Sequence, residues 1–245
     1  MNHIFLTATA VSGWEHLKQR LYDAVIYDDR WKMYLEGLAR TLQIAIIACV
    51  LGVLLGVIIA MVKTAAQESK NPVLRVANFV CNVYTTVIRG TPQMIQLLII
   101  YTMAIMPNGL IACFIGFGIN SGAYLSETFR GGIQSVDIGQ MEAARSLGLS
   151  RNEAMIRVVL PQAIKNMLPA IFNEFIMLVK DTSIAGYIAV NELTKLSNAI
   201  RNRTYDSITY FITAAIYLLL TFLLTLVLGR LERRFAKSDR DRKSR

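Results

Sequence analysis

The sequence has 245 residues, 54% of them hydrophobic, and a formal net charge of +9. The hydrophobic residues are concentrated in long runs, which excludes an ordinary soluble domain and predicts an all-α integral membrane protein. In a soluble protein the positive charge would raise nucleic acid as a partner. Here the placement of basic residues around membrane spans explains the charge better, so no nucleic-acid partner is expected.

Residues 1–36 are expected to form an amphipathic arm ahead of a transmembrane domain, residues 37–230. Large apolar residues recur in the arm at roughly helical spacing among charged ones: Trp14, Leu17, Leu21, Val25 and Trp31. This pattern predicts a helix that lies in the membrane interface, with tryptophan at the level of the lipid headgroups. The arm lacks the basic start and apolar core of a cleaved signal peptide.

About five transmembrane helices account for the apolar runs, since about 20 residues of helix cross a bilayer core. The first is expected at residues 38–62, where Gly52 and Gly56 form a GxxxG pattern that permits close helix approach without naming the partner helix. The later spans are expected at residues 110–129, 167–188 and 208–229. Pro169 should lie in the first turn of the fourth span, where proline is tolerated.

The second span, residues 72–106, is too long for one regular helix, at roughly 50 Å for 1.5 Å per residue. Pro92 interrupts it within the run Arg89-Gly90-Thr91-Pro92, because proline removes a backbone donor and disfavours helix in the residue before it. Broken backbone at membrane depth is tolerated mainly inside protein or beside a wet cavity. We therefore expect a cavity near this break.

A polar segment, residues 139–161, separates the third and fourth spans. Gly148 suits a left-handed helix end, and Ser150 with Glu153 has the pattern of a capping box. We expect two short helices on either side of the Gly148 turn, the second ended by Pro161. Such a compact knob with an apolar face fits a groove on another protein.

Basic residues predict the orientation of the chain in the membrane. With five spans, the segments on one side carry 16 basic and 7 acidic residues, and those on the other carry 8 basic and 7 acidic residues. The positive-inside rule places the first set in the cytoplasm. That side includes residues 139–161 and the basic C-terminal tail, residues 231–245.

No catalytic or metal-binding pattern is present in the sequence. None of the 15 glycines is followed by lysine, so the phosphate-binding GxxxxGK loop is absent. Both histidines, His3 and His16, lie in the N-terminal arm. The isolated cysteines indicate neither a disulfide framework nor a metal site; they are Cys49, Cys81 and Cys113. We therefore expect no enzyme activity and no cofactor.

Charged residues within or beside the spans are the candidates for function, because an ionisable group at membrane depth is costly and usually paired or facing a wet interior. They are Arg89, Glu127, Glu174, Lys180 and Asp181.

Glu174 and Arg89 have two interpretations each. Glu174 could receive an ammonium or guanidinium group of a substrate, or form an internal ion pair with Arg89 or Lys180. Arg89 together with Gln96 could hold an α-carboxylate through parallel hydrogen bonds, or Arg89 could fix the broken backbone before Pro92.

Several motifs together resemble the permease subunits of bacterial ABC importers, in the polar amino acid branch that carries histidine, arginine, glutamine, glutamate or opines. The polar segment is similar to the EAA loop that these permeases dock on their ATPase subunits, although Val158 stands where the family usually has isoleucine. Its matching residues are Glu142, Ala143, Ala144, Gly148, Leu160 and Pro161. The resemblance covers about residues 34–230 and includes the motif at residues 89–92.

This resemblance implies a type I importer fold and a multi-pass permease in the bacterial inner (plasma) membrane, with its C-terminus in the cytoplasm. It implies a homo- or heterodimer of permeases, a cytoplasmic ATPase dimer that hydrolyses the ATP, an extracytoplasmic solute-binding protein and an amino acid substrate. Asn82, Gln96 and Glu174 match positions that are contacts for substrate where such a site exists. Glu174 favours a cationic amino acid.

Two other classes of function remain open. An ion-coupled secondary transporter would need internal repeats and coupling-ion acids at the membrane midplane. A membrane-anchored interaction protein would explain the knob and the basic tail but would leave Arg89 and Glu174 without a role. A co-purifying ATPase and ATP-dependent transport distinguish the importer from both.

Overall fold

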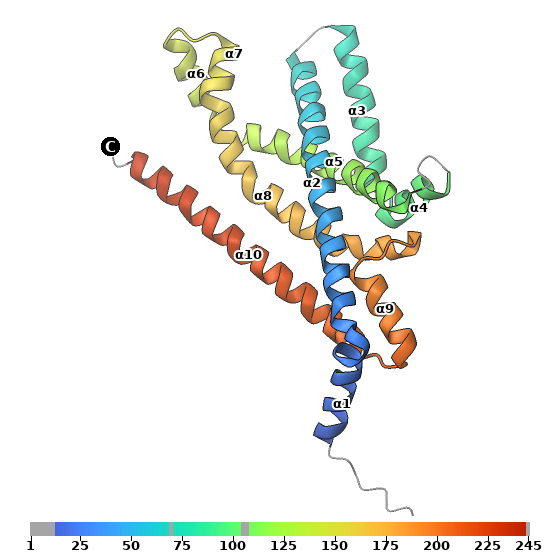
Figure 1. Cartoon of the computed structure of the whole chain (residues 1–245). Coiled ribbons are helices and arrows are strands. Elements are labelled where there is room, and N and C mark those ends of the chain that lie inside the picture. The colour runs from blue at the N-terminus through green and yellow to red at the C-terminus, as the bar shows by residue number, and fades with distance from the viewer. Residues whose placement is uncertain (1–12, 69–70, 104–107, 244–245) are drawn as a thin grey trace, which may run out of the picture.

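The computed structural model describes residues 13–68, 71–103 and 108–243, which form helices and connecting turns without a strand in these ranges (Figure 1). The helices in chain order are α1 (Gly13–Val25), η1 (Tyr27–Asp29), α2 (Arg30–Glu68), α3 (Pro72–Gly90), α4 (Gln93–Thr102), α5 (Gly109–Gln134), α6 (Ile138–Ser146), α7 (Arg151–Ala154), η2 (Met155–Val159), α8 (Leu160–Asp181), η3 (Thr182–Ile188), α9 (Leu193–Thr204) and α10 (Ile208–Lys243).

Three helical stretches of the described chain are long and apolar enough to cross a membrane: Tyr27–Gln67, Gly109–Gln134 and Ile208–Arg233. They contain the predicted first, third and fifth spans. The first is longer than predicted, because α2 continues past the apolar run at both ends and already includes residues 30–36 of the expected arm.

The predicted break in the second span is confirmed. Helix α3 ends at Gly90 and α4 begins at Gln93, and both Thr91 and Pro92 between them have extended backbone angles. The cause is the one expected from the sequence, since proline disfavours helix in the preceding residue and has no N–H to donate.

The predicted roles of Pro161 and Pro169 are wrong. The second helix of the polar segment does not end at Pro161 but passes through the π-helical turn η2 into α8, which begins at Leu160. The wide turn bonds the Leu160 N–H to the Met155 carbonyl, and Pro161 then occupies a first-turn position that needs no N–H donor. Consequently Pro169 lies inside α8, not in its first turn.

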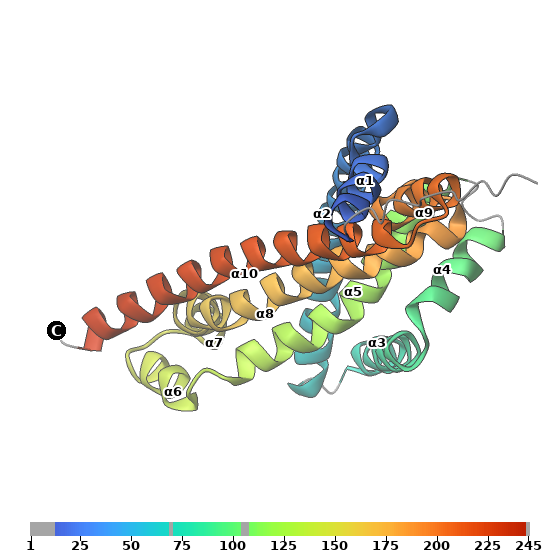
Figure 2. The same ribbon diagram turned by 90° about the horizontal axis from the view of Figure 1, so that it is seen from below.

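The packed core lies where α2, α5 and α8 meet. Its main cluster includes Ile44 of α2, Phe117 of α5 and Leu178 of α8, all at most 1% exposed. Figure 2 shows α8 between α5 and α10. In contrast, α10 exposes large apolar side chains such as Leu218 and Phe222 along its length, as expected of a helix that faces lipid.

The GxxxG pattern brings α2 and α5 together within this chain. A Cβ atom on Gly52 would lie 2.7 Å from the Ser121 Oγ, and one on Gly56 would lie 3.0 Å from the Leu125 Cβ. Both helices therefore approach each other at a distance that only glycine permits at these positions.

The two ends of the molecule differ in structure. Helices α6 and α7 lie at one end together with the end of α2 and the start of α3, and α1 and α9 lie at the other (Figure 1). Helix α10 runs from the α9 end toward the α6–α7 end. The tryptophans expected on one interface helix are divided, with Trp14 on α1 and Trp31 on α2; both are exposed.

Candidate functional site

The turn between α6 and α7 has the geometry predicted for it. Gly148 has φ of 89°, its N–H bonds the Arg145 carbonyl at 3.0 Å, and the Leu149 N–H bonds the Ala144 carbonyl at 3.2 Å. This pair of bonds is the Schellman arrangement, in which a left-handed residue satisfies the last carbonyls of a helix. Gly148 therefore sets the angle between the two short helices.

The second helix of this hairpin starts with the predicted capping box. The Glu153 backbone N–H donates to Ser150 Oγ at 3.3 Å, and the Ser150 N–H donates to Glu153 Oε2 at 2.9 Å. The Ser150 hydroxyl and the Ser150 N–H both donate to the Glu153 carboxylate and lower its pKa, because they stabilise its charged form. The N-cap residue Ser150, two residues after Gly148, thus fixes where α7 begins.

The α6–α7 hairpin buries small residues and exposes larger ones. Ala144 and Ala154 are buried, whereas Leu147 is 86% exposed. A hollow of about 730 Å³ lies between the two helices, lined among others by Glu142 and Arg145. Of the other residues that match the EAA pattern, Ala143 and Pro161 are exposed and Leu160 is half-buried. The hairpin thus presents an exposed leucine and charged side chains at its surface.

Gln96, not Arg89, fixes the broken backbone between α3 and α4. Its Nε2 donates to the Ile88 carbonyl at 2.7 Å and to Thr91 Oγ1 at 2.7 Å. Its Oε1 accepts a bond of 3.0 Å from Asn120 Nδ2 on α5. The guanidinium of Arg89 instead lies 5.2 Å from the ring centre of Tyr124, and Arg89 is exposed.

Glu174 lies partly buried on α8, next to Ser121 of α5. None of the ion pairs formed by the described residues includes Glu174. The internal pairing with Arg89 or Lys180 considered from the sequence is therefore not formed in this structure. Gln96 and Glu174 thus approach neighbouring residues of α5, the former through Asn120 and the latter through Ser121.

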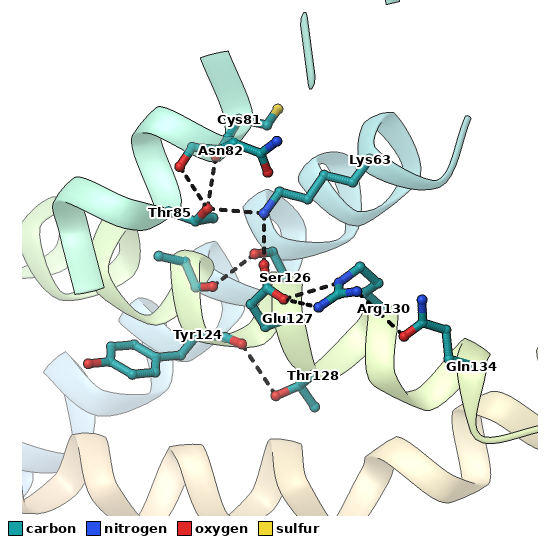
Figure 3. Close-up of polar contacts among 11 residues, drawn as sticks. Lys63, Cys81, Asn82, Thr85, Tyr124, Ser126, Glu127, Thr128, Arg130 and Gln134 are labelled. Atoms are coloured by element: carbon teal, nitrogen blue, oxygen red, sulfur yellow. Dashed lines mark hydrogen bonds and ion pairs between the residues drawn. The ribbon is translucent and has the colours of Figure 1, made fainter. Parts of the chain in front are cut away.

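A charged cluster joins α2, α3 and α5 (Figure 3); of its ionisable residues only Glu127 was a candidate from the sequence. Lys63 is only 5% exposed, and its Nζ donates to Thr85 Oγ1 at 3.0 Å and to Glu127 Oε1 at 2.7 Å. Arg130 Nη2 donates to the other oxygen of Glu127, Oε2, at 2.7 Å. The cluster leaves one net positive charge, because two cations share one carboxylate.

This cluster opens into a pocket of about 170 Å³ at the hairpin end of the helices. Every residue that lines the pocket is polar: Lys63, Gln67, Asn78, Asn82, Glu127 and Arg130. Asn82, expected to contact substrate, therefore lies here and not with Gln96. The sequence did carry one signal, since Glu127 and Arg130 are three residues apart on one helix, but Lys63 reads as a loop charge at the end of an apolar run.

Comparison with known proteins identifies the family. Residues 52–237 match the family described as the binding-protein-dependent transport system inner membrane component. The chain belongs to this family. Similar curated proteins are amino acid permeases: the arginine transport system permease protein ArtQ of Bacillus subtilis is 35% identical over 84% of this chain and 93% of its own length. The nopaline transport system permease protein NocM of Agrobacterium fabrum is 34% identical over 78% of this chain and 83% of its own length.

Solved structures agree with this assignment. The crystal structure of an amino acid ABC transporter with histidines has a TM-score of 0.78 and 38% identity, and the match covers 89% of this chain and 97% of that one. A structure of the MetNI methionine ABC transporter, 15% identical with a TM-score of 0.73, shares the fold. The predicted fold of a type I importer permease is thereby confirmed.

The chain is thus a permease subunit of the amino acid ABC importer type and a multi-pass inner membrane protein. The family is one of transport permeases, not of enzymes, and implies an ATPase and a solute-binding protein as partners. These findings favour the importer over the secondary transporter and over the interaction protein considered from the sequence.

Proposed function

We propose that this chain forms the transmembrane pathway of an ATP-driven amino acid importer, with a separate ATPase docked on the α6–α7 hairpin. The observation that carries the proposal is the continuous helical path from α7 through η2 into α8. A displacement of the hairpin is therefore passed to a membrane helix without an intervening loop. The chain itself has no GxxxxGK loop, so ATP is hydrolysed by the partner.

The residues of the EAA pattern have different roles in docking. Glu142 and Ala143 face outward on α6, where a partner reaches them, and Ala144 packs inside the hairpin. Gly148 sets the turn, and Leu160 with Pro161 begins α8. The hairpin then acts as a rigid unit, because its shape is set by backbone bonds and buried alanines.

The complete importer contains a permease dimer, a cytoplasmic ATPase dimer and an extracytoplasmic binding protein. In this arrangement the α6–α7 end and the C-terminal tail face the cytoplasm, and the α1–α9 end faces the binding protein. Residues 1–36, 37–230 and 231–245 then serve as interface arm, transmembrane domain and basic cytoplasmic tail.

The transported solute is a polar amino acid, with preference for a cationic one. Similar permeases are named for the transport of arginine, L-cystine and nopaline. Glu174 supports the preference, because a partly buried carboxylate without an ion-pair partner among the described residues favours a positively charged group over glutamate. Arg89 and Gln96 border the pathway near the helix break. Gln96 acts there by hydrogen bonding to the backbone on the α3 side of the break.

Uptake competition tests the substrate proposal. The permease is reconstituted with its ATPase and binding protein, and uptake is measured for L-arginine, L-glutamine, L-glutamate and L-cystine, each alone and in competition. Glu174→Gln should reduce L-arginine uptake more than L-glutamine uptake while leaving assembly with the ATPase intact. Equal loss for both amino acids, or no loss, removes Glu174 from substrate selection.

A further inference from the structure

We propose that the polar pocket between α2, α3 and α5 binds a carboxylate, and that this carboxylate belongs to the amino acid as it leaves the permease at the hairpin end. This inference deepens the proposed import function and rests on it. It is separate from Glu174, which lies on α8 and does not line the pocket.

The hydrogen-bonding capacity left over in the cluster consists largely of donors. Both oxygens of Glu127 are occupied, Oε1 by Lys63 and Oε2 by Arg130. The Lys63 ammonium has three N–H groups and uses two of them, on Glu127 and Thr85. Arg130 has five N–H groups and places two nitrogens on Glu127 and one, at 3.5 Å, on Gln134. Spare donors on two cations select an anionic acceptor.

The amide residues of the pocket are also available to a ligand. The side chains of Gln67, Asn78 and Asn82 line the pocket and form no hydrogen bond within the described part of the chain. An amide offers both donors and an acceptor. The amides can therefore accept from an amino group while the cations hold the neighbouring carboxylate, which is the polar pattern of an α-amino acid.

The size and position of the pocket suit a small ligand that is leaving the permease at the hairpin end. Its volume of about 170 Å³ lies below the roughly 300–1,000 Å³ typical of sites for drug-sized ligands. Lys63 lies five residues before the end of α2, roughly 7–8 Å of helix. The pocket is therefore near the surface at the end where α6 and α7 lie (Figure 1).

Thiol protection in the assembled transporter tests the site. The native cysteines are first replaced (Cys49→Ala, Cys81→Ala, Cys113→Ala), and Asn78→Cys then places a thiol in the pocket. N-ethylmaleimide labelling is measured in proteoliposomes with the ATPase, in the presence of L-arginine, L-glutamine, their α-carboxamides or acetate. Arg75→Cys is the matched control, because Arg75 is exposed on the same helix and does not line the pocket.

The proposal predicts that a transported amino acid slows labelling of Asn78→Cys, that its α-carboxamide does not, and that Arg75→Cys is labelled at the same rate throughout. Adding Arg130→Gln should raise the concentration for half-protection roughly tenfold or more, because one charge-assisted hydrogen bond is lost. If that variant does not assemble, protection of Asn78→Cys alone decides.

Absence of protection in vesicles that take up the same amino acid overturns the pocket assignment, as does equal protection by the carboxamide. Equal protection by acetate identifies an adventitious anion site and also overturns it. Failure of ATP-dependent uptake for every amino acid counts against the import function instead, since labelling in the same vesicles still reports on the pocket.

Discussion

Gln96 of α4 accepts a 3.0 Å hydrogen bond from Asn120 of α5 and at the same time donates to the Ile88 and Thr91 carbonyls across the helix break, at 2.7 and 3.1 Å. One side chain therefore holds the end of α3, the start of α4 and the middle of α5 together. Broken backbone at membrane depth requires such substitute partners, because lipid offers none.

Replacing Gln96 with leucine should destabilise the permease. The substitution keeps the size but leaves at least one buried polar group without a partner, a loss of about 1–3 kcal/mol. Thermal unfolding of the detergent-solubilised permease measures it. Gln93→Leu is the matched control, since Gln93 Nε2 is buried without a partner in the described structure and loses no bond. Equal stability of the two variants contradicts the assigned role of Gln96.

Replacing Gly148 with valine should uncouple transport from ATP hydrolysis. A β-branched residue at φ of 89° carries a strain of about 1–3 kcal/mol, and a Cβ there meets nothing within 4 Å, so the effect arises from the backbone alone. Gly148→Asn should retain much of the coupling, because asparagine tolerates this conformation. The measurement is amino acid uptake per ATP hydrolysed; full coupling in Gly148→Val would remove the turn from the mechanism.

Valine at Gly52 should weaken the contact between α2 and α5. The added Cβ would lie 2.7 Å from Ser121 Oγ and 3.2 Å from the Gly122 backbone nitrogen, and overpacking of this kind costs about 1–3 kcal/mol. Gly229→Val on α10 is the control, since nothing lies within 4 Å of a Cβ there. Melting temperatures should fall for the first variant only, and a matching fall for both would show that valine in the span is itself harmful.

The attachment of α1 to the start of α10 should depend on pH. Arg20 donates to both oxygens of Asp206 at 2.6 Å, and this bond lowers the pKa of Asp206 from 3.8 to about 2. A lowered carboxyl pKa stabilises the folded state above the unfolded value, so the contribution is complete above pH 4 and is lost as pH falls toward 2. Protease cleavage near α1 should accelerate over that range.

Asp206→Asn should reproduce the loosened α1 at neutral pH. Asparagine keeps an oxygen for the Ile208 N–H, which Asp206 Oδ1 accepts at 2.9 Å, but removes the charge that Arg20 needs. Asp28→Asn serves for comparison, because Asp28 lies 3.9 Å from Arg203 and both side chains are largely exposed. A larger effect of Asp28→Asn would mean that Arg20 and Asp206 do not anchor the arm.

The sequence predicts those features whose causes are local. The break before Pro92 and the left-handed turn at Gly148 follow from the conformational limits of proline and glycine at one position. The capping box follows from residues three apart. The continuation of α7 through Pro161 was not predicted, because a π-helical turn has no comparable local signal and replaces the helix end that proline normally indicates.

The charged cluster could not be predicted because its partners are distant in sequence. Lys63 and Glu127 lie 64 residues apart, and only the packing of α2 on α5 brings them together. The role of Gln96 was likewise not predictable from the sequence. Its position near Pro92 indicated a polar pathway, but its hydrogen bond to Asn120 depends on the tertiary fold. Glu174 was recognisable as a candidate from its charge within an apolar run, but the choice between an internal ion pair and substrate contact depends on the tertiary fold.

ATP-driven import is tested most directly by uptake of a radiolabelled amino acid into proteoliposomes that contain the permease, its ATPase and its binding protein. We expect accumulation that requires ATP on the hairpin side, stops when the ATPase is omitted and persists when ion gradients are dissipated. Accumulation driven by an imposed proton or sodium gradient in the absence of ATPase and ATP would contradict it.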